Sequence, residues 1–255
     1  MVWNPSTYLA FADERTRPAA ELLARIAEDA PQRVIDLGCA PGNSTALLRA
    51  RWPHAHLEGL DSSPEMLVKA RQSGVEADWI QADVGAWSAT GAYDVIFSNA
   101  ALQWLGDHPA LVPRLLGAAR PGGTFAFQVP HNMDAPSHAL MRETAADGPW
   151  TGKLKGIREI SILAPQDYYG ILAPHAASVD IWETEYLHVL QGEDAVYHWV
   201  SGTGLRPFVN ALAGAARDAF IAAYQQKLAT AYPRHSDGAT LFPFKRLFVV
   251  ARRWA

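Results

Sequence analysis

The sequence is short of cysteine, of basic charge and of long apolar runs, and each shortage excludes a class of protein. Cys39 is the only cysteine among 255 residues, so the chain forms no intramolecular disulfide and no thiolate metal cluster. The formal net charge is -4 and there is no long basic run, which disfavours nucleic acid as a partner, since phosphates are bound by clustered Lys and Arg. No stretch approaches the roughly 18 apolar residues that a membrane-spanning helix needs.

The N-terminal segment Met1–Phe11 is polar and aromatic, without the basic start and apolar run of a secretory signal. Together with the single cysteine, this predicts a cytoplasmic protein with no membrane partner. The composition is 49% hydrophobic and 19% charged, which is typical of a globular protein. We therefore expect one domain over residues 1–255, with a single large core.

The motifs of two common enzyme classes and a complete metal site are also missing. There is no Gly-x-Gly-x-x-Gly, which counts against a nicotinamide-dependent dehydrogenase, and no Gly-x-Ser-x-Gly, the exposed nucleophile of many hydrolases. His54 and His56 have a spacing that could suggest a metal, but no third ligand is evident. We predict no metal.

The most informative stretch that is present is Val34–Gly42. It is an apolar run interrupted by Asp36 and followed by a turn of small residues, and a helical pattern begins at Asn43. This order predicts a buried parallel strand entering a tight loop, where Gly38 and Gly42 let the backbone bend sharply and approach a ligand. The turn contains no basic residue, so the nearby carboxylate suits the cationic end of a ligand better than a pyrophosphate.

Strands and helices alternate along the first half of the chain, which predicts a doubly wound parallel sheet. The expected strands are Arg33–Leu37, His56–Leu60, Asp78–Gln81, Tyr93–Ser98 and Thr124–Val129. The expected helices are Asn43–Arg51, Pro64–Ser73, Pro109–Ala119 and, after a cap at Thr16 and with Pro18 at its start, Ala19–Ala30.

After Pro130 the pattern changes. Residues 131–176 contain Gly, Pro and short helical patches, and we interpret them as an insertion over the sheet edge. Residues 191–237 form a second, mainly helical insertion, with helices expected at Ala195–Ser201 and Arg206–Tyr232. Alternation predicts a late strand over Val179–Val189, and an apolar run predicts a final strand over Phe242–Ala251.

The loop Gly38–Gly42, with Ala40 where glycine is usual, resembles the first motif of the class I S-adenosylmethionine-dependent methyltransferases. Asp61 ends the second strand, Asp83 ends the third, and Asn99-Ala100 follow the fourth, as in that family. The resemblance implies an α/β fold with a doubly wound, seven-stranded, mostly parallel Rossmann-like sheet, an antiparallel last strand and helical insertions that form a substrate cap. It also implies S-adenosylmethionine as cofactor and S-adenosylhomocysteine as product, without a metal.

An acid at the end of the second strand of such a sheet accepts hydrogen bonds from ribose hydroxyls, which is the role expected for Asp61. The resemblance assigns Asp83 to the adenine amino group, and the backbone at Asn99 to the methionine part. The expected cofactor-binding residues are Asp36, Gly38, Ala40, Gly42, Asp61, Ser62, Met66, Asp83, Val84, Asn99 and Ala100.

Five later segments lie outside this shared core: Pro136-Ser137-His138, Gly148-Pro149-Trp150, Trp199-Val200, Thr203–Phe208 and Ala231-Tyr232-Pro233. With these segments the chain resembles the trans-aconitate 2-methyltransferase family. The resemblance implies methyl transfer to one carboxylate of trans-aconitate, which gives a monomethyl ester. A carboxylate with a pKa near ~4 is already ionised at neutral pH, so we expect no catalytic base and a mechanism of positioning alone.

Two carboxylates of such a substrate do not react, and the planar guanidinium group of arginine is best suited to hold them. We expect Arg206 and either Arg15 or Arg17 to do so; Arg17 could instead pair with the carboxylate of the cofactor. The residues expected to wall the substrate pocket are Trp104, His131, Trp150 and Tyr168, although His131 is also explained as an ordinary loop residue.

Other acceptors and another class of protein remain open. The acceptor could be a different small carboxylic acid or a malonyl thioester, whose acidic carrier protein would need a basic face such as Lys153–Arg158. A regulatory module that binds S-adenosylmethionine without catalysis would keep the glycine loop but would need no acceptor pocket. Arg206, in an apolar and glycine-rich run, argues against such a module.

Overall fold

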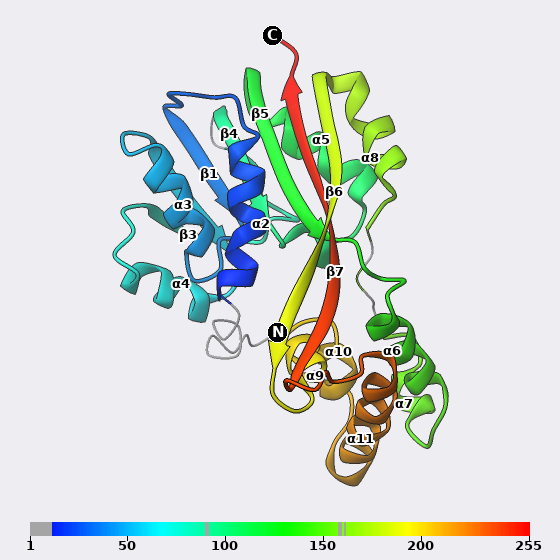
Figure 1. The fold of residues 1–255 in the computed structure, drawn as a ribbon. Helices are drawn as coiled ribbons and strands as arrows, with labels where there is room; N and C mark the ends of the chain where they lie inside the picture. The colour runs from blue at the N-terminus through cyan, green and yellow to red at the C-terminus, as the bar shows by residue number, and fades with distance from the viewer. Residues whose placement is uncertain (1–11, 90–91, 158–159, 161) are drawn as a thin grey trace. The chain divides into compact units, whose positions relative to one another are not determined.

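The structure, a computed structural model, describes residues 12–89, 92–157, 160 and 162–255 (Figure 1). It divides into two compact units. Unit 1 combines the chain up to Pro130 with Ser161–Thr184 and Arg246–Ala255, and unit 2 combines His131–Ile160 with Glu185–Lys245.

Seven strands form a single sheet in the order β3-β2-β1-β4-β5-β7-β6. The strands are β1 (Arg33–Leu37), β2 (His56–Asp61), β3 (Asp78–Gln81), β4 (Tyr93–Asn99), β5 (Ala119–Pro130), β6 (Ala176–Gln191) and β7 (Ala239–Arg253). The first five pair in parallel, and β7 runs antiparallel to β5. The predicted seven-stranded, mostly parallel sheet is confirmed. Because parallel strands share one carboxyl edge, the loops after β1, β2, β3 and β4 emerge on the same side of the sheet.

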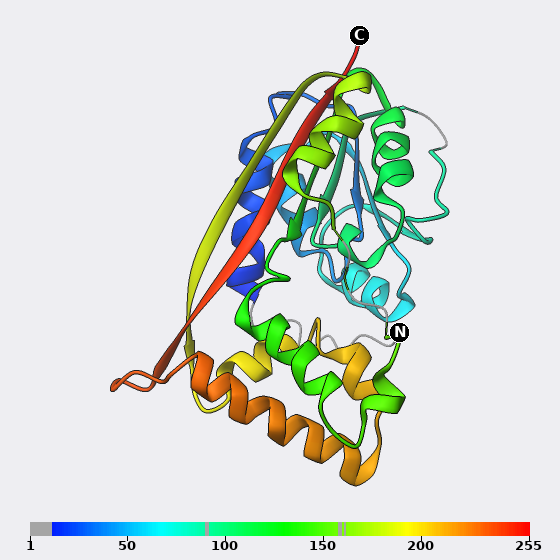
Figure 2. The ribbon, with the colours of Figure 1, turned by 90° about the vertical axis from the view of Figure 1, so that its right-hand side faces the viewer.

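Helices cover both faces of the sheet in unit 1 (Figures 1 and 2). On one face α2 packs against α3 and β5, and on the other α5 packs against β5 and α8. These helices and the short η1 are α2 (Ala12–Ala24), α3 (Asn43–Arg51), α4 (Pro64–Gln72), η1 (Leu102–Trp104), α5 (His108–Gly117), α8 (Pro165–Leu172) and η2 (Ala173–His175).

Unit 2 is mainly helical. Its helices are α6 (Pro136–Ala146), α7 (Thr151–Leu154), α9 (Ala195–Ser201), α10 (Arg206–Asn210) and α11 (Gly214–Ala231). Aromatic side chains fill its interior: Phe220 is fully buried and stacks on Phe208 with ring centroids 6.4 Å apart. The helix expected over Arg206–Tyr232 is broken into α10 and α11, with Gly214 in the left-handed conformation (φ 53°) at the start of the second.

The predicted start of the first helix was wrong. Pro18 lies inside α2, which extends from Ala12 to Ala24 and so begins earlier and ends earlier than the expected Ala19–Ala30. Pro18 has no N–H to donate, which costs the helix one hydrogen bond. Ala19, Leu22 and Leu23 are all buried, and the burial of this face offsets that cost.

The sequence Arg120-Pro121-Gly122-Gly123 predicts a turn, but these residues lie within β5. Tyr93 pairs with Ala119 but Val95 pairs with Thr124, so the extra residues form a bulge in the strand. Gly122 is left-handed with φ of 74°. The predicted turn was therefore wrong: the strand continues through these residues and pairs with β4 on both sides of the bulge, which local sequence does not reveal.

The core of unit 1 lies between the sheet and the α5–α8 pair. It contains Ile96, Phe125, Phe127, Leu115 and Leu172, each fully buried. Residues 162–176, expected within an insertion, therefore belong with the sheet, because α8 packs on α5. Within the described ranges, no helix has the length and apolar character needed to cross a membrane.

Candidate active site

The loop between β1 and α3 contains three residues in the left-handed conformation. The φ angle is 75° at Gly38, 50° at Ala40 and 96° at Gly42. A Cβ on Gly38 would lie 2.2 Å from the Cβ of Ala101, and one on Gly42 would lie 3.1 Å from the ring of Trp79. Gly38 is therefore required both by its conformation and by the close approach of the segment after β4. For Ala40, the left-handed conformation costs roughly 1–2 kcal/mol.

Asp61 joins this loop to the one after β2. Its Oδ2 accepts a 2.9 Å hydrogen bond from the main-chain N–H of Ala40, and its Oδ1 accepts a 2.8 Å bond from that of Ser63. Burial raises the pKa of the Asp61 carboxyl, while these main-chain donors act to lower it. Each carboxylate oxygen can accept a second hydrogen bond, so Asp61 can hold the loop and a ligand hydroxyl together.

Asp36 is a fully buried carboxyl on β1. The hydroxyls of Ser44 and Thr45, in the first turn of α3, each donate a 2.7 Å hydrogen bond to Oδ2. Oδ1 is buried and has no partner in the described part of the chain. Burial raises the pKa of Asp36 to about 6, partly offset by the two hydroxyls. A buried carboxylate with one unoccupied oxygen suits a cationic N–H donor.

The sequence analysis missed Ser44 and Thr45. The available signal was a pair of hydroxyl side chains at the start of the helix that follows the glycine loop. Side chains there point back toward the strand end, because the Cα–Cβ bonds of a helix tilt toward its N-terminus. Their hydroxyls reach Asp36 for that reason.

The predicted residues after β2 and β3 fall into two groups. Ser62 and Asp83 are exposed, and Oδ1 of Asp83 accepts a 2.8 Å hydrogen bond from the N–H of Gly85 in the turn after β3. The side chains of Met66 and Val84 are only 1% and 7% exposed, and Val84 belongs to the core of unit 1. The first group offers side-chain groups to a ligand, whereas the second mainly supports the sheet.

Asn99, at the end of β4, is held from a neighbouring strand. Its Oδ1 accepts a 2.6 Å hydrogen bond from Nε2 of Gln128 on β5, and Oε1 of Gln128 accepts a 3.3 Å bond from the buried Arg246 on β7. Ala100 follows in the left-handed conformation, with φ of 54°, and its N–H donates to the carbonyl of Gln128. The segment after β4 is thus anchored through both side chain and main chain.

A small cavity in unit 1 brings several of these pieces together. It is lined by Thr16, Ala19, Gly38, Cys39, Ala40, Pro41, Asn43, Ser44 and Asn99. The structure therefore places the glycine loop, the end of β4 and one side of α2 around a common space. A contribution from this segment was expected only through Arg15 or Arg17, and the lining residues Thr16 and Ala19 of α2 were not predicted.

Of the candidate substrate residues in unit 1, Arg17 and Trp104 are accessible. The Arg17 side chain is 68% exposed and forms a 3.3 Å ion pair with Glu21 one helical turn later. Trp104 is half-buried and ends η1. Arg15 lies in α2, but its side chain is outside the described part of the chain.

Tyr168 is not a pocket-wall residue, contrary to expectation. It is fully buried in the core of unit 1 and packs edge-on against Phe127 at 5.3 Å. Its hydroxyl lies 2.6 Å from Nδ1 of His108 and is therefore hydrogen-bonded within the core. A tyrosine in a short helix with polar neighbours gives no sequence signal that separates a buried ring from an exposed one.

The candidate substrate residues in unit 2 also fall into half-buried and fully packed groups. Arg206 begins α10 and is half-buried, and burial lowers the pKa of its guanidinium. His131 is half-buried, and its main-chain N–H donates to the carbonyl of Lys245. Trp150 was expected to wall the pocket, but it is only 5% exposed, donates its indole N–H to the carbonyl of Thr144 at 2.6 Å, and belongs to the interior of unit 2.

His138 is a residue near Arg206 that was not predicted. Its Nε2 lies 3.1 Å from the position of a Cβ on Gly204, in the segment that leads into α10. Burial, with a contribution from Arg142, lowers the pKa of His138 to about 4. Its imidazole is therefore neutral at physiological pH and offers a hydrogen bond without a charge.

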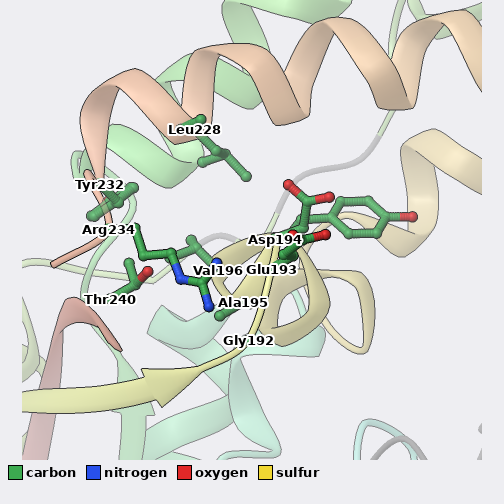
Figure 3. A pocket seen from close by; sticks show the side chains of 11 residues that line it. Gly192, Glu193, Asp194, Ala195, Val196, Leu228, Tyr232, Arg234 and Thr240 are labelled. Atoms are coloured by element: carbon green, nitrogen blue, oxygen red, sulfur yellow. The ribbon is translucent and has the colours of Figure 1, made fainter. Parts of the chain in front are cut away.

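Unit 2 also has a hollow of about 320 Å³ at the C-terminal end of α11 (Figure 3). It is lined by Gly192, Glu193, Asp194, Ala195, Val196, Tyr197, Leu228, Ala229, Tyr232, Arg234 and Thr240. Arg234 donates from Nε to the carbonyl of Gly238 at 2.8 Å. Glu193 and Asp194 share the hollow with Arg234, so its charges are mixed, and none of the predicted substrate residues lines it.

Among residues 12–89, 92–157, 160 and 162–255, no group of three or more His, Cys, Asp or Glu side chains is placed to hold a metal ion. The site on unit 1 is thus built from carboxylates, hydroxyls and main-chain groups around a glycine loop. Such a site can bind a ligand with hydroxyl groups and a cationic end.

Comparison with known proteins agrees with this description. The profile of a family described as a methyltransferase domain matches residues 11–167. The trans-aconitate 2-methyltransferase of Azoarcus sp. (strain BH72) is 52% identical over 98% of this chain and 99% of its own length. The enzyme of the same name from Paracidovorax citrulli is 49% identical over 99% of both chains.

Solved structures share the fold at low sequence identity. The YcgJ protein from Bacillus subtilis superposes with a TM-score of 0.61 at 14% identity, over 94% of this chain and 99% of its own. A putative methyltransferase from Bacillus halodurans gives a TM-score of 0.59 at 10% identity, over 94% of this chain and 100% of its own. At such identities the likeness establishes the architecture alone.

Proposed function

The chain belongs to the methyltransferase family and, within it, to the trans-aconitate 2-methyltransferases, and from this premise we propose that it methylates a carboxylate of trans-aconitate. The methyl donor is S-adenosylmethionine, and the products are a monomethyl ester and S-adenosylhomocysteine. The observation that carries the proposal is near-full-length likeness, 52% identity over 98% of the chain, combined with the glycine loop and its two carboxylates.

The residues of unit 1 fit the methyl donor. The close approach at Gly38 leaves room for no side chain there, and the unpaired Oδ1 of Asp36 suits an ammonium group. When bound, S-adenosylmethionine supplies an electrophilic methyl group on a positively charged sulfur. We assign the ribose hydroxyls to Asp61, the adenine amino group to Asp83 and the methionine part to the main chain at Asn99 and Ala100.

The main chain and supporting side chains complete this assignment. Gly42 and Ala40 shape the loop, and Ala40 also fixes Asp61 through its N–H. Ser62 is exposed directly after β2, where a hydroxyl can face the ribose. Met66, in α4, and Val84, in the segment after β3, contribute as buried supports.

The acceptor needs no general base. A carboxylic acid with a pKa near ~4 is ionised at neutral pH, so its oxygen is already a nucleophile. The protein then has to align that oxygen with the methyl group and exclude water, which is catalysis by positioning. The reacting carboxylate is best held by neutral donors, because a close guanidinium would reduce its nucleophilicity.

Arginine suits the carboxylates that do not react, since it binds them through two parallel hydrogen bonds. We assign Arg206 to this role, because its half-buried guanidinium is desolvated in an apolar segment. Arg17 serves the acceptor or the carboxylate of the methyl donor. Trp104, His131 and the neutral His138 are the candidates for single hydrogen bonds to the reacting carboxylate.

A panel of acceptors tests the proposal. Purified protein is incubated with methyl-labelled S-adenosylmethionine and, separately, trans-aconitate, cis-aconitate, citrate, isocitrate and a malonyl thioester. The expected result is label in a base-labile ester of trans-aconitate at a kcat/KM at least about tenfold above that of any other acid. Transfer to the malonyl thioester alone, or to no acid despite tight donor binding, contradicts the proposed acceptor.

A further inference from the structure

The segment after β4 forms one wall of the candidate methyl-donor site. Asn99 lines the small cavity, and Ala101 approaches Gly38 so closely that a Cβ there would lie 2.2 Å from its own Cβ. The segment continues as η1, where the N–H of Trp104 donates to the carbonyl of Ala101. Any shift of η1 therefore moves the wall relative to the glycine loop.

A hydrogen bond from a buried histidine holds η1 in place. Nε2 of His108, at the start of α5, lies 3.0 Å from the carbonyl of Leu102, and the imidazole is only 3% exposed. A carbonyl can only accept, so Nε2 carries the proton and donates to Leu102. Burial lowers the pKa of His108, so the ring is neutral and its Nδ1 is an acceptor.

Tyr168 completes the arrangement. Its hydroxyl donates to Nδ1 of His108 at 2.6 Å, which fixes the tautomer that donates to Leu102. The N–H of Leu163 donates to the same hydroxyl at 3.4 Å. Tyr168 lies on α8, far along the chain from β4 but packed against α5 (Figure 2). A single buried hydrogen-bonded chain thus runs from α8 through α5 to η1.

We propose that Tyr168 and His108 are positioning residues for methyl transfer, which hold the Leu102 carbonyl so that Ala101 keeps its place beside Gly38 and Trp104 keeps its hydrogen bond to Ala101. This inference rests on the proposed function and adds to it a support that touches neither ligand. Without this hydrogen-bonded chain, the segment after β4 can shift relative to the glycine loop. Because methyl transfer depends on alignment, a shift of about an ångström lowers the rate of the reaction far more than it lowers the affinity for the ligand.

Tyr168→Phe is the direct test, because it removes the hydroxyl and keeps the ring that packs on Phe127. Tyr93→Phe is a matched control in the same unit. Tyr93 is 1% exposed and donates a 2.6 Å hydrogen bond to Glu58, and it begins β4 at the opposite edge of the sheet from the glycine loop. Each substitution removes one buried hydroxyl and its two hydrogen bonds, to His108 and Leu163 for Tyr168 and to Glu58 and Arg33 for Tyr93, so a loss of unfolding free energy is expected in both variants.

The two variants should differ in kinetics. Tyr168→Phe is expected to lower kcat about tenfold while KM for the methyl donor stays within about twofold, the pattern of lost transition-state alignment. Tyr93→Phe is expected to keep the wild-type kcat. Equal kcat in the two variants would overturn the proposal, because a purely structural role of the hydroxyl would treat them alike.

A second pair of variants covers the case in which Tyr168→Phe does not fold. In His108→Gln the side-chain amide can still donate to the Leu102 carbonyl, whereas His108→Leu cannot. His108→Gln should therefore retain several-fold more kcat than His108→Leu. Equal losses in both would contradict the positioning role.

Amide hydrogen exchange separates this inference from the proposed function. The N–H of Leu105 donates to the same Leu102 carbonyl, so loss of the His108 anchor should speed its exchange in the apo protein about tenfold. The measurement needs no acceptor, so it can be made even if the wild-type protein methylates no acid and the proposed function fails. Unchanged exchange of the Leu105 N–H in Tyr168→Phe would refute the claim that Tyr168 and His108 hold η1 in place.

Discussion

Oδ2 of Asp61 accepts a 2.9 Å hydrogen bond from the main-chain N–H of Ala40, so one carboxylate links the loops that follow β1 and β2. The bond also holds Ala40 in a left-handed conformation that alanine does not favour. The residue assigned to the ribose is therefore also a residue that shapes the glycine loop.

Replacement of Asp61 should affect both tasks. Asp61→Ala removes the acceptor for the ribose hydroxyls and the anchor of Ala40, and the affinity for S-adenosylmethionine should fall by at least about tenfold, as measured by calorimetry. Asp78→Asn is the control, since Asp78 starts β3 and its side chain is 69% exposed. Unaltered donor affinity in Asp61→Ala would rule out the ribose role.

Gly38 should tolerate no side chain. In Gly38→Ala the new Cβ lies 2.2 Å from Ala101, and the left-handed φ adds strain. We therefore expect the free energy of unfolding and the free energy of donor binding each to fall by about 1–3 kcal/mol. Gly117→Ala is a matched control, because no heavy atom lies within 4 Å of the added Cβ. Urea unfolding and calorimetry report the two quantities, and wild-type behaviour of Gly38→Ala would contradict the close approach.

Asp36 should make stability depend on pH. Burial raises its folded pKa to about 6, from an unfolded value near 4, so the folded state binds the proton more tightly. The group therefore favours the folded state most below pH 4, and this contribution is lost as the pH rises through about 6. The carboxylate is retained for ligand binding at a cost to stability.

Asp36→Asn removes the titration. Relative to wild type, the free energy of unfolding of the variant should increase between pH 4 and pH 7 by on the order of 2 kcal/mol, while donor affinity at pH 7.5 falls. Urea unfolding at both pH values checks the first part. A constant difference between the two proteins across this range would show that Asp36 does not titrate there.

Arg206 is the residue on which the acceptor assignment depends most. Arg206→Ala should raise KM for the acid acceptor at least about tenfold and leave donor affinity unchanged, because only a carboxylate partner is lost. Arg206→Lys should recover part of the lost affinity for the acid, because the lysine ammonium keeps the positive charge but not the two parallel hydrogen bonds of the guanidinium. Arg217→Ala, an exposed arginine of α11, is the control. Unchanged KM in Arg206→Ala would remove it from the site.

The sheet could be predicted because its signals are local. Buried strands contain apolar runs, such as Val95-Ile96-Phe97 in β4. The loop after β1 needs glycine at Gly38 and Gly42, a spacing that few other structures require. The resemblance to a methyltransferase family then supplied the number of strands and the antiparallel last strand, whereas the order of the strands came from the structure. The ligand roles of Asp36, Asp61 and Asp83 remain predictions.

Long-range packing was not predictable in the same way. Tyr168 and Trp150 were expected in a pocket, but the sequence does not say which side of a short helix faces a core. Pro18 inside α2 shows the same limit, since burial of a helix face offset a local preference. The support of η1 by His108 and Tyr168 joins residues from three separate segments, and no local pattern marks it.

The most direct measurement is the identity of the methylated product. Purified protein, S-adenosylmethionine and trans-aconitate are incubated, and mass spectrometry follows the acid and S-adenosylhomocysteine together. The expected result is one added methyl group per trans-aconitate, lost in mild base, with an equal amount of S-adenosylhomocysteine. Release of S-adenosylhomocysteine without methylated acid, or unchanged reactants despite a bound methyl donor, would contradict carboxyl methylation of trans-aconitate.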